Sequence, residues 1–380
     1  MGVHFKEKSL QIFILQGFEL MRSGERGIRT PGPVTVNGFQ DRRIRPLCHL
    51  SGANIDLEFI PAKFILQIIC GLILNTQVKR FEMDYNQLGK SDLEVSRIGF
   101  GCMSLKPGQP QNESIIHRAI DLGINYFDTA DLYDRGANEQ LLGNALKQKR
   151  NQIIIATKVG NQWRSDGNGW DWNPRKEYIL KSVDESLKRL QTSYIDLYQL
   201  HGGTIDDPVE ETIDAFEQLV KQGKIRYYGI SSIRPNVIRY WTEHSNMVSV
   251  MMQYSLLDRR PEEECLRLLG EKNIGVLVRG SVAQGLLVDK PPRPYLNYSE
   301  QEVSNAAKAI QLISKNDRTH AQTAIQFVLR KPEISSAVVG IRTMVQLNEA
   351  VNTFSVPELS ALQIASLSNS IPVNVYKEHR

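Results

Sequence analysis

The sequence has little of what marks a disulfide-stabilised, metal-binding or membrane-spanning protein. Its 380 residues include only four cysteines, which are isolated from one another and show no zinc-ligand spacing. No Gly-x-Gly-x-x-Gly fingerprint opens a helix, so a Rossmann domain is not indicated. No apolar run reaches the roughly 20 residues needed to span a bilayer. Free thiols without a disulfide framework favour a reducing cytoplasmic location.

The chain also lacks an excess of charge over most of its length. Residues 1–82 hold 11 basic and 7 acidic residues and therefore carry the entire net charge of +4, whereas the remainder has 35 of each. A neutral main domain argues against a nucleic-acid surface. The sequence predicts neither a nucleic-acid partner nor a membrane, and it does not indicate an oligomeric state.

The sequence pattern of residues 1–82 differs from that of the rest of the chain. These residues are predicted to be an N-terminal extension that is disordered or arises from a misassigned start. Residues 23–33, SGERGIRTPGP, resemble the translation of a transfer-RNA gene, and Met83 directly precedes the regular part of the chain. Two functional interpretations remain open for this segment. Residues 59–74 are apolar enough to suggest a membrane anchor but too short to span. Arg42, Arg43 and Arg45 could form a nucleic-acid or lipid patch, although three basic residues seldom suffice.

From residue 84 onward, strand and helix patterns alternate eight times, as expected of βα units. Helical periodicity recurs between the strand-like runs, for example over 179–190, 209–220 and 321–329. We expect a single catalytic domain, 83–380, folded as an α/β (β/α)8 TIM barrel. The strand-like runs end near Gly101, Asp128, Lys158, His201, Ser231, Gln253, Arg279 and Gly340.

Four side chains with complementary chemistry stand at or just past the ends of three strand-like runs. The runs cover 124–133, 153–158 and 194–201, and the side chains are those of Asp128, Tyr133, Lys158 and His201. In a parallel barrel such ends converge on one face. The four residues are therefore expected to become neighbours.

Together these groups can protonate a carbonyl oxygen without a metal. A tyrosine with a pKa of about 10 needs stabilisation of its phenolate, which an adjacent Lys158 ammonium supplies, so we expect Lys158 to make Tyr133 a better acid. Asp128 would compensate the buried ammonium, and His201 would orient the carbonyl. Taken singly, each residue also has a structural interpretation as a helix cap, an ion-pair member or a polar loop residue.

These motifs and their order resemble the aldo-keto reductase family over about residues 84–352. The resemblance rests on LGKSDLEVS at 88–96, GFGCM at 99–103 and the three runs above. It implies that Asp128, Tyr133, Lys158 and His201 form the family's catalytic tetrad. Tyr133 would be the general acid, and a reduced nicotinamide would supply the hydride.

The resemblance also implies where the cofactor NADPH would bind. Gly101, Cys102 and Met103 end the family's first strand, and Ser231 and Gln253 would hold the carboxamide. The pyrophosphate and adenosine ends would be held by Ser281, Gln284, Gly285, Leu286, Gly340, Arg342, Thr343, Gln346 and Glu349. Arg342 could pair with a 2′-phosphate, or could be an ordinary surface arginine at a helix end.

Two positions depart from the family's pattern. Arg279 stands where many members stack an aromatic ring on the nicotinamide, although a guanidinium can also stack on a planar ring. Ala350 replaces a frequent asparagine at the adenine end. Trp163, Trp170 and Trp172 follow the third strand, where they could contact the substrate or simply anchor their loop.

The sequence thus predicts an oxidoreductase that reduces a small aldehyde or ketone with NADPH. Two alternatives stay open. One is an aldolase that uses Lys158 as a Schiff-base nucleophile. The other is a binding protein that senses NADPH without turnover. Fold alone does not choose between them, because barrels host many chemistries.

Overall fold

The computed structural model describes residues 83–315 and 317–380. The expectations for the N-terminal extension, including the possible anchor at 59–74 and the arginine patch, lie outside the described residues. Within the described residues, no helix combines the length and apolar composition that crossing a membrane requires.

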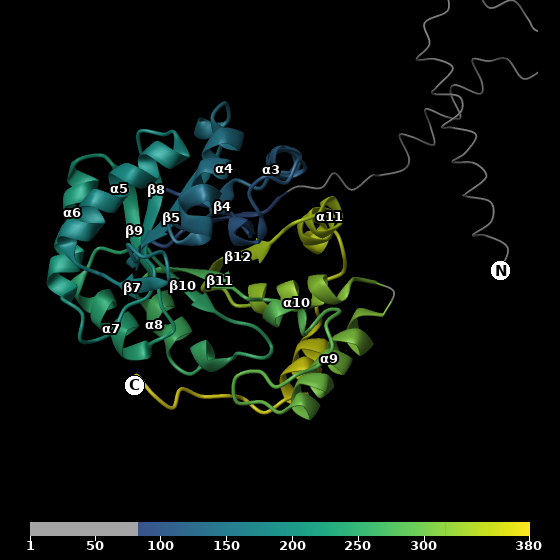
Figure 1. Cartoon of the computed structure of the whole chain (residues 1–380). Coiled ribbons are helices and arrows are strands. Elements are labelled where there is room, and N and C mark those ends of the chain that lie inside the picture. Colours follow the sequence, from purple (N-terminus) through teal and green to yellow (C-terminus); the bar gives the residue numbers. More distant parts are fainter. Residues whose placement is uncertain (1–82, 316) are drawn as a thin grey trace, which may run out of the picture. The chain divides into compact units, whose positions relative to one another are not determined.

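Eight parallel strands close into a barrel (Figure 1). Each strand pairs with the next barrel strand in the chain, and the last pairs with the first through Gly340 and Gly101. The barrel strands are β3 (Ile98–Gly101), β4 (Tyr126–Asp128), β5 (Ile154–Val159), β8 (Ile195–Leu200), β9 (Ile225–Ser231), β10 (Ser249–Gln253), β11 (Gly275–Arg279) and β12 (Ile334–Gly340).

Helices surround the strands and bury one face against them. In α5, for example, Ile179, Val183 and Leu190 lie on one buried face, as the helical repeat requires. The α-helices are α3 (Asn112–Asp121), α4 (Ala137–Leu146), α5 (Lys176–Leu190), α6 (Val209–Lys221), α7 (Pro235–His244), α8 (Cys265–Glu271), α9 (Glu300–Ser314), α10 (His320–Leu329), α11 (Met344–Val351) and α12 (Ala361–Asn369). Short 3-10 helices are η2 (Cys102–Ser104), η3 (Tyr133–Gly136), η4 (Arg150–Gln152), η5 (Arg260–Glu262), η6 (Ala283–Gly285) and η7 (Asn352–Phe354).

The predicted (β/α)8 barrel is therefore confirmed, and every expected strand end falls within one residue of an observed one. The reason is that barrel strands buried on both faces read as continuous apolar runs that stop at a polar residue. The long loop after the third barrel strand contains a small hairpin, β6 (Asn161–Trp163) with β7 (Trp170–Trp172).

A second hairpin precedes the barrel and closes its N-terminal end. Strands β1 (Tyr85–Gln87) and β2 (Glu94–Ser96) pair antiparallel. Leu88 and Leu93 of this hairpin join a buried cluster with inward-facing strand residues such as Leu277. The φ of Gly89 is +55°, and a Cβ at that position would lie 2.5 Å from the Val248 carbonyl oxygen, so only glycine fits this close approach.

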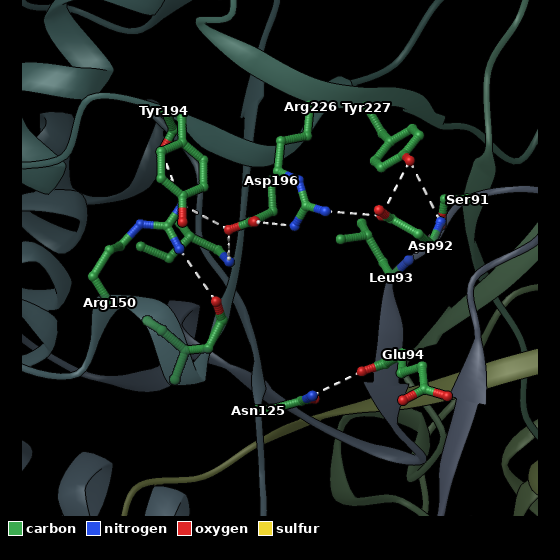
Figure 2. Close-up of polar contacts among 12 residues, drawn as sticks. Ser91, Asp92, Leu93, Glu94, Asn125, Arg150, Tyr194, Asp196, Arg226 and Tyr227 are labelled. Carbon is green, nitrogen blue, oxygen red and sulfur yellow. Dashed lines mark hydrogen bonds and ion pairs between the residues drawn. The ribbon is translucent and has the colours of Figure 1, made fainter.

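A chain of charged contacts links this hairpin to the strands (Figure 2). The Asp196 carboxylate of β8 is buried, forms an ion pair with Arg150 at 2.7 Å and accepts a hydrogen bond from Arg226 at 3.1 Å. The Ile155 backbone N–H donates to the same carboxylate at 3.0 Å. Arg226 continues to Asp92 in the hairpin turn at 2.8 Å. Asp196 is thus the central acceptor of this end of the barrel.

We expect Asp196→Asn to lower the free energy of unfolding by about 2 kcal/mol. The amide retains the size of the side chain but loses the charge that strengthens its bonds to two guanidinium groups. Urea unfolding at pH 7 measures the change. The matched control is Asp92→Asn, because the Asp92 side chain is 67% exposed and its ion pair should contribute less than about 1 kcal/mol. Equal losses in the two variants would contradict this ranking.

Candidate active site

The buried centre of the site is an ion pair between Lys158 and Asp128. Lys158 Nζ donates to Asp128 Oδ1 at 2.6 Å and to the Thr129 carbonyl oxygen at 2.8 Å. Gln199 Nε2 lies 3.5 Å from the other oxygen of Asp128. Asp128 ends β4, Lys158 lies in the neighbouring β5, and Gln199 lies in β8, so three adjacent strands assemble the pair.

Electrostatics keep Lys158 charged. Burial lowers the pKa of Lys158, but Asp128 and Tyr133 together raise the pKa by more, and the net shift is upward. The side chain is only 1% exposed. A buried ammonium of this kind acts as a fixed positive charge rather than as a nucleophile.

Tyr133 and His201 lie beside this charge. Tyr133 begins η3, and Lys158 Nζ lies 5.2 Å from the centre of its ring. The His201 ring packs edge-on against Tyr133, with ring centres 5.7 Å apart. His201 follows β8, where its backbone N–H donates to the Val159 carbonyl oxygen at 2.7 Å. The structure therefore brings together all four side chains singled out at the strand ends.

Lys158 lowers the pKa of Tyr133, as the sequence predicts, but burial has the larger effect. Burial raises the pKa of the Tyr133 phenol, and the positive charges of Lys158 and Arg279 lower it only in part, so the net shift is upward. Lys158 makes Tyr133 more acidic than burial alone would leave it, but not more acidic than a free tyrosine. The sequence alone could not weigh desolvation against charge, because burial is a property of the fold.

His201 is held neutral. Burial, together with the charges of Lys158 and Arg279, lowers the pKa of His201 to about 3. Its Nδ1 atom is inaccessible and has no hydrogen-bond partner among residues 83–315 and 317–380. A neutral imidazole has one N–H, which can donate a single hydrogen bond to a ligand oxygen.

Open space adjoins Tyr133 at the C-terminal end of the barrel. A cavity of about 540 Å³ lies between the loops that follow the first three barrel strands. Its walls mix aromatic, apolar and charged side chains, namely Met103, Lys106, Leu132, Tyr133, Asp134, Arg135, Trp163 and Trp170. Trp172 is not among them, because its indole N–H donates to Asp207 at 2.9 Å and anchors the loop.

Three residues expected to surround the nicotinamide of a cofactor lie at the same, C-terminal end of the barrel. Ser231, Gln253 and Arg279 are the last residues of β9, β10 and β11. Arg279 donates to the Gln253 side-chain oxygen at 2.9 Å, and the Gln253 amide nitrogen donates to Asp258 at 2.9 Å. The Gln253 amide is therefore fixed in orientation.

The other residues expected to contact a cofactor lie in the loop after β11 and at the end of the first barrel strand. Ser281, Gln284, Gly285 and Leu286 follow β11, and Gln284 and Gly285 have φ angles of +59° and +92°. The side chains of Leu286 and Cys102 are buried in the core, so their contacts with a cofactor would come from the backbone. Gly101 ends β3, and Met103 lies in η2, which follows directly.

The start of α11 carries the candidates for the adenosine end. Thr343 caps the helix by accepting from the Gln346 backbone N–H at 3.2 Å, and the Arg342 backbone N–H donates to the Gln346 side chain at 2.9 Å. The Arg342 side chain is exposed, Gly340 ends β12, and Glu349 lies one turn further along α11. An exposed guanidinium beside a helix N-terminus is a suitable site for a phosphate.

Comparison with known proteins agrees with this geometry. Residues 97–371 match the model of the Aldo/keto reductase family. This chain belongs to the aldo/keto reductase family. It is 48% identical over 307 residues to the uncharacterised oxidoreductase YqkF of Bacillus subtilis, covering 78% of this chain and all of that protein. It is 30% identical over 280 residues to the fission yeast aldo-keto reductase yakc [NADP(+)], covering 67% and 82% of the two chains.

A solved aldo-keto reductase has the same architecture. The holo form of an enzyme from Bacillus halodurans superposes with a TM-score of 0.74 at 48% identity, covering 79% of this chain and all of the other. The family assignment and the oxidoreductase class inferred from the sequence are therefore confirmed. Family membership makes a nicotinamide cofactor and a small carbonyl substrate the expected ligands.

Sequence reasoning missed several residues of this aldo/keto reductase site. Lys106, Asp134 and Arg135 line the cavity but carry no motif. Gln199 was detectable, since strand alternation places it on the same face as His201 two residues later. Arg135 could have been noticed from its position two residues after Tyr133, but its orientation depends on a backbone conformation that the sequence does not reveal.

The low pKa of His201 predicts a specific pH dependence of stability. As the pH falls below 6.5 the unfolded chain binds a proton at this residue, whereas the folded protein does not until about pH 3. The contribution of neutral His201 to the free energy of unfolding is therefore fully present above pH 6.5 and is lost progressively below it. Between pH 7.5 and 4.5, we expect the unfolding free energy to fall by about 2 kcal/mol more in the parent than in His201→Gln.

Urea unfolding at several pH values, without cofactor, measures this difference. The control is His244→Gln, which removes an exposed imidazole that stacks on Tyr240. The control should retain the parental pH dependence. An identical loss of stability in the parent and in His201→Gln would show that His201 is protonated in the folded protein.

Proposed function

We propose that this chain reduces an aldehyde or ketone to an alcohol, with NADPH as hydride donor and Tyr133 as general acid. The observation that carries the proposal is the buried Lys158–Asp128 pair next to the Tyr133 ring, with neutral His201 against the same ring. A fixed positive charge beside a phenol at the edge of a cavity is suited to delivering a proton to a developing alkoxide.

The proton would move from Tyr133 Oη to the substrate oxygen. The phenolate that remains is stabilised by the Lys158 ammonium, which Asp128 and the Thr129 carbonyl oxygen hold in place. Because the pKa of Tyr133 is raised by burial, the phenol keeps its proton until the carbonyl oxygen gains negative charge. His201, being neutral, would donate a hydrogen bond that orients the carbonyl.

The donor groups on the rim fit a nicotinamide dinucleotide, which would supply the hydride when bound. Ser231 and the Gln253 side-chain oxygen suit a carboxamide, and Arg279 could stack on the ring. The Gln253 amide nitrogen is already used, because it donates to Asp258 and to Tyr295. Ser281 and the loop of Gln284, Gly285 and Leu286 suit the pyrophosphate. Exposed Arg342 favours NADPH through its fork geometry, and the name of the fission yeast relative carries NADP(+).

The raised pKa of Lys158 argues against the first alternative, a Schiff-base aldolase. A Schiff-base aldolase needs an amine that loses its proton, whereas the pKa of Lys158 is raised. The geometry therefore favours reduction. Cys102 and Cys265 are buried free thiols, which supports placing the enzyme in a reducing cytosol.

Hydride tracing tests the proposal against both alternatives. The protein would be incubated with NADPH deuterated at the transferred C4 position and a panel of aldehydes and ketones, and the alcohols analysed by mass spectrometry. Deuterium at the carbinol carbon is the expected result. Tight NADPH binding without any labelled alcohol would favour the sensing protein, and borohydride trapping of a substrate on Lys158 would favour the aldolase.

A further inference from the structure

The loop directly after Tyr133 adopts an unusual backbone conformation. Asp134, Arg135 and Gly136 have φ angles of +47°, +55° and +83°. For the two residues with side chains, the left-handed region costs about 1–2 kcal/mol each. Strain of this kind persists only where surrounding contacts hold it, and it is concentrated at functional positions.

The contacts that hold this loop fix the Arg135 guanidinium. Its central carbon lies 4.8 Å from the centre of the Trp163 ring, and Nη2 donates to the Gly167 carbonyl oxygen at 2.7 Å. Both partners belong to the loop after β5. The guanidinium is therefore stacked and oriented at the cavity wall, although the residue is exposed.

Arg135 has no acidic partner in the part of the chain that the structure describes. Other arginines nearby are paired, since Arg164 contacts Asp171 at 2.6 Å and Arg189 contacts Glu139 at 2.6 Å. One hydrogen bond uses one of five guanidinium donors, so most of the fork remains available.

The other charges on the cavity wall offset each other. Lys106 lies 3.5 Å from Asp134, and both line the cavity. What remains is the single positive charge of Arg135 beside the flat faces of Trp163 and Trp170. A planar ligand can lie against the exposed indole of Trp170 while an anionic substituent meets the guanidinium that is stacked on Trp163.

We propose that the substrate is an aromatic aldehyde or ketone that carries a carboxylate, and that Arg135 selects it by binding this group. The inference rests on the proposed reductase function and adds its substrate class. Tyr133 and Arg135 both line the cavity of about 540 Å³. A ring bound in this cavity would present its carbonyl to Tyr133 and its carboxylate to Arg135.

The test compares 4-carboxybenzaldehyde with its neutral methyl ester as substrates of the full chain. We expect kcat/KM for the carboxylate to exceed that for the ester by about 10-fold, mainly through KM, and the ratio to decrease with added salt. In Arg135→Gln the ratio should fall to about 1. The ester is the internal reference, because a general loss of activity through the loop would lower both turnovers alike and would not by itself change their ratio. Arg135→Lys should retain part of the preference, because it keeps the charge but not the fork.

Arg164→Gln is the matched control. It removes a cation from the loop after β5 that is already paired with Asp171, so the parental ratio should persist. Absence of a carboxylate preference in the parent, or its survival in Arg135→Gln, would overturn the inference.

A binding measurement separates this inference from the reductase proposal. Calorimetry with 4-(hydroxymethyl)benzoate and its methyl ester, in the presence of NADPH, needs no turnover. If neither aldehyde is reduced but the carboxylate binds at least 10-fold tighter and Arg135→Gln removes that difference, the reductase proposal fails and the binding site stands. Equal affinity for both compounds refutes the site.

Discussion

Replacement of Tyr133 by phenylalanine is expected to lower kcat for carbonyl reduction by about 10²–10⁴-fold. The variant keeps the ring that packs on His201 and lies beside Lys158, so the fold and the cavity wall persist. What is lost is the phenol O–H that we propose as the proton donor. Oxidation of NADPH followed by absorbance measures kcat, and quenching of protein fluorescence by NADPH shows whether cofactor affinity is retained.

Tyr198→Phe provides a control for the loss of one buried phenol oxygen. Tyr198 lies in β8, is fully buried, and its hydroxyl has no hydrogen-bond partner among the described residues. This variant should keep at least about half of the parental kcat. If Tyr133→Phe were as active as Tyr198→Phe, the acid would have to be another group.

Removal of the buried charge should produce the second large effect. Lys158→Met fills similar space but leaves the Asp128 carboxylate buried without its cation, which is expected to reduce the free energy of unfolding by about 3–5 kcal/mol. Activity should fall by about 10²-fold or more in addition, because the Tyr133 phenolate loses its stabilising charge. Urea unfolding and NADPH oxidation measure the two effects separately.

A paired replacement separates stability from catalysis. In Asp128→Asn combined with Lys158→Met, no unpaired charge remains, so most of the stability should return. Activity should not return, since the cation is still missing. Recovery of turnover in the double variant would show that Lys158 acts only as a structural partner of Asp128.

The parts of the site that lie on strands were predictable from the sequence. Asp128, Lys158 and His201 each terminate an apolar run, and a closed parallel barrel brings such ends to one rim whatever the helices between them look like. The need of a buried ammonium for a counter-charge then indicates that Asp128 and Lys158 form a pair, as the 2.6 Å contact shows.

The parts that depend on loops were not predictable. Arg135 has a left-handed conformation, and its side chain contacts Trp163 and Gly167, which come from a different loop. Likewise, the upward shift of the Tyr133 pKa results from burial by surrounding elements, which local sequence does not encode. Trp172 resembled its neighbours in sequence, yet its bond to Asp207 makes it an anchor.

The hairpin and the Asp196 contacts (Figure 2) stabilise the N-terminal end of the barrel, whereas the cavity lies at the C-terminal end. Mutations that alter the loops around Tyr133 therefore leave these contacts untouched. Such a division gives the protein evolutionary freedom: its substrate range can drift, or be re-engineered by exchanging loops, while the contacts at the other end continue to stabilise the barrel.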